Sequence, residues 1–244
     1  MPTRLVALHV HSWYSLLEGV DSPQRLLEMA AARGYIALAF TDTNNLYGVP
    51  AIYDLAWQYG VRPIFGACLR QPGPHSASRP KERPITDTRI HPFRCTVLIS
   101  EPEGYSNLCT ILSRLHVHSH PLLELLLEYH EGLQILVDSP QWLEVLQPVW
   151  RERLWAELIR PGKSTKQERA LLETATARGI RIVASWAVHF AEAQGWRIFR
   201  LLQAIRHRTI VTRLPKSLGV MPAHYLLSVA EVWHRFADIP EDLV

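Results

Sequence analysis

Near its beginning the chain reads Leu5-Val-Ala-Leu-His-Val-His11, a short apolar run that ends in two histidines. A run of this length and composition predicts a β-strand. Residues two apart on a strand point to the same side, so His9 and His11 are expected to present both imidazoles to one metal ion. Taken alone, such a pair occurs more often as packed polar side chains than as a metal site, so both interpretations stay open at this point.

Six further runs of the same kind follow along the chain. With the first, the predicted strands are Leu5–His9, Ile36–Phe40, Arg62–Phe65, Cys95–Ile99, Leu133–Val137, Leu154–Ile159 and Arg181–Ala184. Amphipathic stretches predict helices over Ser22–Arg33, Val49–Tyr59, Tyr105–His116 and Lys166–Arg178. A strand followed by a helix, repeated about seven times, predicts an α/β fold with a parallel sheet.

Two segments depart from this alternation. Residues 70–94 hold five prolines, which remove too many backbone donors for a regular helix or a central strand. We expect a proline-rich excursion from the main domain, which spans residues 1–209. Residues 210–244 are expected to form a C-terminal extension, in which Ser228 and Glu231 predict a capping box for a short helix over Ser228–Phe236.

The excursion also carries a basic cluster of Arg79, Lys81 and Arg83, which could contact nucleic-acid phosphates. Glu82 and Asp87 dilute this charge. A solvated loop is therefore the preferred interpretation of the cluster, and nucleic-acid binding is the alternative.

The composition excludes two broad classes of protein. The chain has 244 residues, of which 48% are hydrophobic and 20% are charged, which supports one sizeable core and argues against disorder throughout. No apolar run approaches the ~18 residues that span a bilayer, so no membrane partner is expected. Three scattered cysteines and a beginning without the pattern of a secretory peptide predict a cytoplasmic protein. A net charge of +3 does not by itself indicate a nucleic-acid surface.

Longer strings extend the histidine pair into a recognisable pattern. They read His9-Val-His-Ser-Trp-Tyr-Ser-Leu-Leu-Glu-Gly19, Leu38-Ala-Phe-Thr-Asp-Thr-Asn-Asn-Leu-Tyr-Gly48, Arg62-Pro-Ile-Phe-Gly66 and Val183-Ala-Ser-Trp-Ala-Val-His-Phe190. In this order and spacing the chain resembles, over essentially its whole length, the PHP (polymerase and histidinol phosphatase) domain at the amino terminus of bacterial DNA polymerase III α subunits and their error-prone relatives. The resemblance implies a distorted seven-stranded, TIM-like β/α barrel with a small C-terminal helical appendage. It also implies a multinuclear metal site at the C-terminal ends of the strands.

Part of the family's ligand set is retained. By the resemblance, the residual metal ligands are His9, His11, Glu18 and His189. Other positions depart from the family pattern, because a histidine, a bridging carboxylate and an aspartate are replaced. We expect the degenerate positions to be Asp42, Thr43, Cys68, Arg94, Ser139 and Ala187.

These departures predict a poor multinuclear centre. Two or three divalent ions held close together need several anionic ligands to offset their mutual repulsion, and an inward-pointing Arg94 would oppose them further. We therefore expect either no metal or a single zinc ion, for which His9, His11 and His189 would leave an open fourth position.

The resemblance and the eroded ligand set together predict a function. We expect a PHP domain of, or associated with, a polymerase similar to the DNA polymerase III α subunit, acting in replication or repair in a mainly structural role and not catalytic alone. Its partner would be the polymerase catalytic region, in cis or in trans, and DNA would be contacted indirectly. The alternatives are a metal-dependent phosphoesterase or 3′–5′ exonuclease, and an accessory nucleic-acid-binding module.

Overall fold

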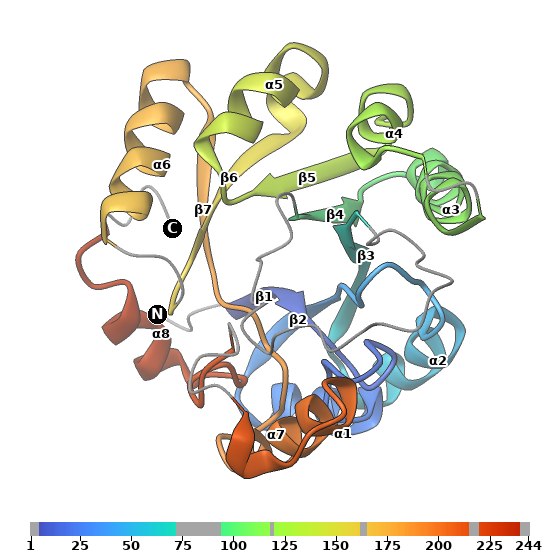
Figure 1. The fold of residues 1–244 in the computed structure, drawn as a ribbon, viewed down its shortest axis with the longest axis vertical. Helices are drawn as coiled ribbons and strands as arrows, with labels where there is room; N and C mark the ends of the chain where they lie inside the picture. Colours follow the sequence, from blue (N-terminus) through green and yellow to red (C-terminus); the bar gives the residue numbers. More distant parts are fainter. Residues whose placement is uncertain (1–4, 72–93, 118–119, 162–164, 215–219, 240–244) are drawn as a thin grey trace.

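The computed structural model describes residues 5–71, 94–117, 120–161, 165–214 and 220–239 (Figure 1). Within them, seven strands form one sheet in sequence order, which curls into a nearly closed barrel. The strands are β1 (Leu5–Val10), β2 (Tyr35–Phe40), β3 (Arg62–Arg70), β4 (Arg94–Ile99), β5 (Leu133–Val137), β6 (Leu154–Ile159) and β7 (Arg181–Ser185). All seven predicted strands are present, and the predicted seven-stranded α/β barrel is confirmed.

Strand β4 corrects the prediction of a parallel sheet. It pairs antiparallel with both β3 and β5, whereas the other four strand pairs are parallel. A parallel pair needs a crossover connection, usually a helix, and the proline-rich sequence between β3 and β4 carries no helical pattern. The chain therefore returns along β3 in the opposite direction.

The boundaries of the predicted excursion are also corrected. Arg70 is the last residue of β3 and Arg94 is the first residue of β4, and the two are paired across the antiparallel ladder. Residues 72–93 lie outside the described ranges, and with them the predicted nucleic-acid contacts Arg79, Lys81 and Arg83.

The barrel closes between its first and last strands. The backbone N–H of His11 donates to the carbonyl of Val188 over 2.8 Å, and the N–H of Val188 donates to the carbonyl of His9, also over 2.8 Å. These two bonds bring the histidines at the end of β1 beside the segment that follows β7.

Helices surround the sheet (Figure 1). They are α1 (Pro23–Ala32), α2 (Val49–Tyr59), α3 (Pro102–Val117), α4 (Leu122–Glu128), α5 (Pro140–Trp150), α6 (Thr165–Arg178), α7 (Gly195–Arg206) and α8 (Val229–Arg235). Helices α4, α5 and α7 were not predicted from the sequence. Of these, α4 spans only seven residues and α5 contains Pro148, so both give a weak helical pattern.

The C-terminal residues pack against the barrel. Leu226, Leu227, Val232 and Phe236 are buried in one core cluster with residues of β1, β2, α1 and α2. Ser228 and Glu231 form the predicted capping box of α8, so that prediction is confirmed.

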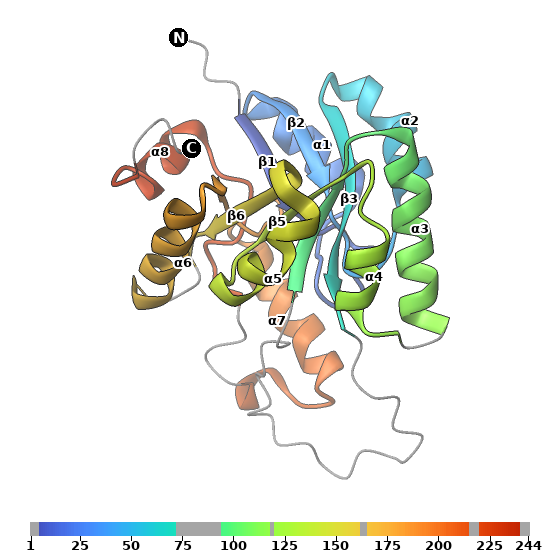
Figure 2. The same cartoon turned by 90° about the horizontal axis from the view of Figure 1, so that it is seen from above.

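In Figure 2, α7 lies at one end of the barrel, and its contacts with the segment after β1 identify this as the end where β1 finishes. Among the described residues, no helix is both long and apolar enough to cross a bilayer.

Candidate metal centre at the barrel mouth

Three predicted site residues meet inside the barrel. His9 and His11 come from the end of β1, and Cys68 comes from β3. One potential ligand atom from each, two imidazole nitrogens and the thiol sulfur, all lie within 4.8 Å of one another, and all three side chains are buried. These residues therefore form a group that offers two nitrogen donors and one sulfur donor.

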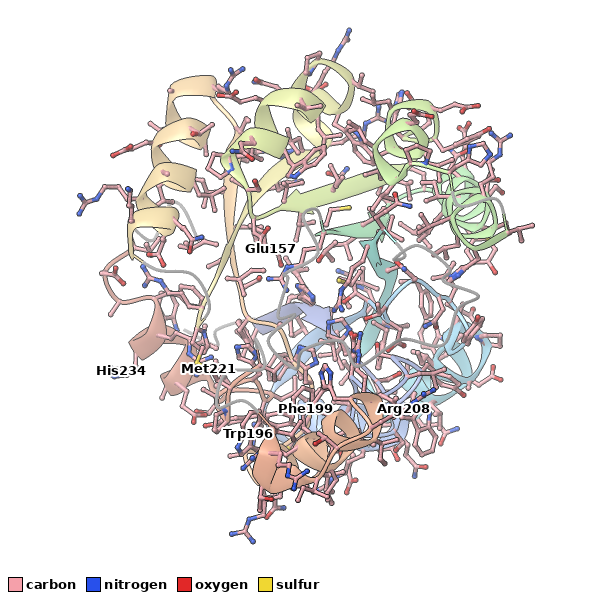
Figure 3. All side chains as sticks on the ribbon, viewed as in Figure 1. Glu157, Trp196, Phe199, Arg208, Met221 and His234 are labelled. Atoms are coloured by element: carbon pink, nitrogen blue, oxygen red, sulfur yellow. The ribbon has the colours of Figure 1, made fainter. Side chains whose placement is uncertain are left out.

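His9 is held by an acidic residue on another strand, β6. Its Nδ1 lies 3.2 Å from Oε1 of Glu157 on β6, and Glu157 in turn accepts a 2.6 Å bond from Ser185. Figure 3 labels Glu157 on the inner side of the barrel. Burial alone would lower the pKa of His9, but the Glu157 carboxylate and the Cys68 thiol outweigh it and raise the pKa to about 9. This raised pKa favours the protonated imidazolium form of His9 at neutral pH.

His11 is the neutral partner of His9. The two Nε2 atoms lie 3.1 Å apart, and Nδ1 of His11 lies 3.1 Å from the hydroxyl of Ser15. Burial, His189 and His9 lower the pKa of His11 well below its ordinary value. A protonated His9 therefore donates through Nε2 to His11, which donates through Nδ1 to Ser15.

The same chain of hydrogen bonds ends on Asp42. Ser15 donates its hydroxyl proton to Oδ1 of Asp42 over 2.6 Å, and the backbone N–H and hydroxyl of Ser12 donate to the two carboxylate oxygens over 2.8 Å each. Burial raises the pKa of Asp42 in spite of these donors. Asp42 thus fixes the loop that follows β1.

Glu18 is bound by two arginines. Arg70 makes a bidentate ion pair with its carboxylate, with both N···O distances 2.8 Å. Arg206, the last residue of α7, also donates to Oε1, and the hydroxyl of Thr43 donates to Oε2 over 2.8 Å. Burial would raise the pKa of Glu18, but Arg70 and Arg206 lower it to about 2.

His189 lies beside His11 and not at a common point with His9 and Cys68. Its ring stacks on that of His11 with a centroid distance of 4.5 Å, and its Nδ1 donates to the backbone carbonyl of Glu18 over 2.9 Å. Burial and the neighbouring His224 lower the pKa of His189 to about 3. The neutral ring keeps its Nε2 as an acceptor.

Three predicted positions remain: Arg94, Ser139 and Ala187. Arg94 forms an ion pair with Asp138 over 3.1 Å. Ser139 is the residue before α5 and makes no side-chain cap bond, while Ala187 is buried after β7. Burial raises the pKa of a thiol, but His9 and Arg70 lower that of Cys68 below its ordinary value.

Sequence reasoning missed three residues of the site: Glu157, Arg70 and Arg206. A glutamate within the apolar strand Leu154–Ile159 is a signal for a buried charge that needs a partner. Arg70 was placed at the start of a loop, and Arg206 lies on an unpredicted helix, so neither position could be assigned to the barrel mouth from the sequence pattern.

Comparisons with known proteins identify the family of this chain. The family model for the PHP domain matches residues 7–181. The chain belongs to the PHP domain family. Over 98% of its length it is 29% identical to the DNA polymerase III subunit alpha of Escherichia coli (strain K12), of which it spans 22%. It is 29% identical over 96% of its length to the error-prone DNA polymerase of Mycobacterium bovis, of which it spans 23%.

Among solved structures, an amidohydrolase from Chromobacterium violaceum matches with a TM-score of 0.47 and 15% identity, covering 75% of this chain and 87% of that one. With respect to the polymerase relatives named above, the chain spans about a fifth of their length.

Proposed function

We propose that this PHP domain has an eroded metal site and supports a polymerase structurally, without hydrolysing phosphoesters itself. The observation that carries the proposal is the pairing of Glu18, the retained acidic ligand, with Arg70 and Arg206. A carboxylate that already neutralises two guanidinium groups has little negative charge left to offer a cluster of divalent ions.

The family's multinuclear centre does not fit the residues present. A second carboxylate beside the site, Asp138, is paired with Arg94. At the predicted degenerate positions Thr43, Cys68 and Ala187, the chain supplies a hydroxyl, a thiol and a methyl group. Guanidinium groups are permanently charged, so Arg70, Arg94 and Arg206 add to the repulsion that any group of cations would meet here.

A single zinc ion is the second candidate, because the donor group of His9, His11 and Cys68 suits it. The Nε2 atoms of His9 and His11 are 3.1 Å apart, close to the spacing of two ligands on one tetrahedral zinc ion. Bound there, zinc would supply Lewis-acid chemistry. A proton competes with zinc for His9, because the Glu157 carboxylate raises the pKa of His9 and stabilises its protonated form.

The polymerase partner is inferred from the relatives. The matched relatives are a DNA polymerase III subunit alpha and an error-prone DNA polymerase, each about five times as long as this chain. We infer that residues 1–209 form the barrel domain and that residues 210–244 lead toward a polymerase region, joined to this chain or separate from it. DNA would then be contacted through that region.

Elemental analysis and a hydrolysis assay test the proposal together. Protein purified without chelator is expected to hold at most one zinc ion per chain, and to release no nitrophenol from a p-nitrophenyl phosphodiester with Mn²⁺ or Zn²⁺. The matched control is His11→Ala, whose rate should equal that of the unaltered protein. Two or more tightly bound ions per chain, or turnover that His11→Ala abolishes, would instead favour a metal-dependent phosphoesterase or exonuclease.

A further inference from the structure

Helix α7 presents an apolar face to solvent. Its buried side is formed by Gly195, Phe199, Gln203 and Ala204. On the opposite side, Ile198, Leu201 and Ile205 lie three and four residues apart and are 51%, 54% and 64% exposed. We call these three side chains the α7 face.

The α7 face differs from the solvent side of α6. On α6, the exposed positions include Lys166, Arg169, Glu173 and Arg178, the charged pattern of a helix that borders water. Scattered exposed apolar residues are ordinary on a protein surface, but a helix whose outermost row is wholly aliphatic indicates an interaction site.

Positive charge is concentrated on α7 and on the segment that follows it. Between Gly195 and Leu214 the chain contains five arginines and no aspartate or glutamate. Arg200 donates to the carbonyl of Val211, and Arg206 holds Glu18. The side chains of Arg197 on α7, Arg208 on the turn after it and Arg213 in the short 3₁₀ helix Val211–Arg213 are exposed. Figure 3 labels Arg208 beside α7. A complementary surface would carry aliphatic side chains surrounded by carboxylates.

This combination favours protein over nucleic acid. Arginines alone would suit DNA phosphates, but a duplex presents no aliphatic surface that could cover Ile198, Leu201 and Ile205. A protein partner can satisfy both parts of the face. The matched relatives carry nearly four-fifths of their length outside the part that this chain matches, so in them a large protein body is available to dock.

We infer that the α7 face is the docking surface for the polymerase region, through an acidic and aliphatic surface of that region. The inference rests on the proposed structural function and adds to it the place of contact. Because Arg206 binds Glu18 and Gln203 donates to the carbonyl of Leu17, α7 is tied to the barrel mouth. The docked region would therefore lie beside the former metal site.

Site-specific photo-crosslinking tests the inference. p-Benzoylphenylalanine replaces Leu201 in the full protein, in the cells that make it, and the crosslinked peptides are identified by mass spectrometry. The matched probe replaces Val145, a 45% exposed aliphatic residue on α5. We expect the Leu201 probe to capture peptides of a C-family polymerase region, from the same chain or another.

A negative charge introduced on the face provides the second measurement. With the probe moved to Ile198, Ile205→Glu should reduce the crosslinking yield about 10-fold or more, because a carboxylate in a partly apolar contact is unpaired when it faces an acidic partner. Val145→Glu should leave that yield unchanged, and both variants should keep the unaltered melting temperature, since the replaced side chains are exposed.

The outcomes separate the two proposals. Capture of a second copy of this chain, of DNA alone or of nothing by the Leu201 probe overturns the docking inference. If the Val145 probe captures the polymerase region while the Leu201 probe does not, the structural function stands and only the docking surface is wrong. If neither probe captures it, the proposed partnership fails as well.

Discussion

Replacing Arg70 by methionine should destabilise the barrel strongly. The pKa of Glu18 is held at about 2, against an ordinary value of 4.5. Since one pKa unit corresponds to about 1.4 kcal/mol, the native environment stabilises the charged carboxylate by about 3 kcal/mol. Arg70 supplies the larger Coulombic part of this stabilisation and Arg206 the next. We therefore expect Arg70→Met to lower the free energy of unfolding by about 2 to 3 kcal/mol.

Urea denaturation at pH 7 with a double-mutant cycle measures this effect. Glu18→Gln combined with Arg70→Met should be less destabilised than the sum of the two single variants, because the pair is removed together and no buried charge stays unpaired. Arg25→Met, which breaks an exposed ion pair with Glu192, is the matched control and should barely move the midpoint.

The pH dependence provides an independent check of the same pair. A carboxylate whose pKa is depressed by folding contributes stability above its unfolded pKa of about 4.5 and loses that contribution as the pH falls through 2. The unaltered protein should therefore lose stability more steeply than Glu18→Gln between pH 5 and pH 2. Additive single variants, or parallel pH curves, would show that the two groups are not coupled as described.

Three further predictions concern other parts of the barrel. The pKa of His9 is raised by folding, so its contribution to the free energy of unfolding is present below about pH 6.5 and is lost as the pH rises through 9. Glu157→Gln should remove this loss of stability at alkaline pH, and pH-dependent denaturation curves parallel to those of the unaltered protein would contradict it. Ser228→Ala should cost about 1 kcal/mol by removing the helix cap, and an unchanged melting temperature would argue against it. Gly104→Ala should destabilise by about 2 kcal/mol or more, because its Cβ would collide with the carbonyl oxygen of Gly132; a variant as stable as the parent would refute that close approach.

The strands were predictable because each is a short apolar run between polar segments. Their pairing direction was less accessible, since nothing in the residues of β4 itself distinguishes a parallel from an antiparallel strand. The information lay in the connection from Arg70 to Arg94, whose prolines exclude a crossover helix. The capping box of α8, by contrast, was predictable from local sequence, because Ser228 and Glu231 are three residues apart and need no distant partner.

The candidate site was predictable only in part. His9 and His11 share one side of β1, so strand geometry alone brings them together. Glu18 was identified by resemblance to the family, but its partners lie 52 and 188 positions further along the chain. Pairings over such separations depend on how the barrel closes, and no local pattern around Arg70 or Arg206 indicates a carboxylate partner.

The closure of the sheet makes β1 and the segment after β7 depend on each other. One short ladder of backbone bonds around Val188 joins them, while neighbouring strands elsewhere are paired over longer registers. The histidines lie directly on this seam, and two of their contacts cross it: His9 with Glu157 on β6, and the ring of His11 with that of His189 after β7. Hydrogen exchange of the backbone amides of His11 and Val188 would therefore measure the free energy of local opening between β1 and the segment after β7.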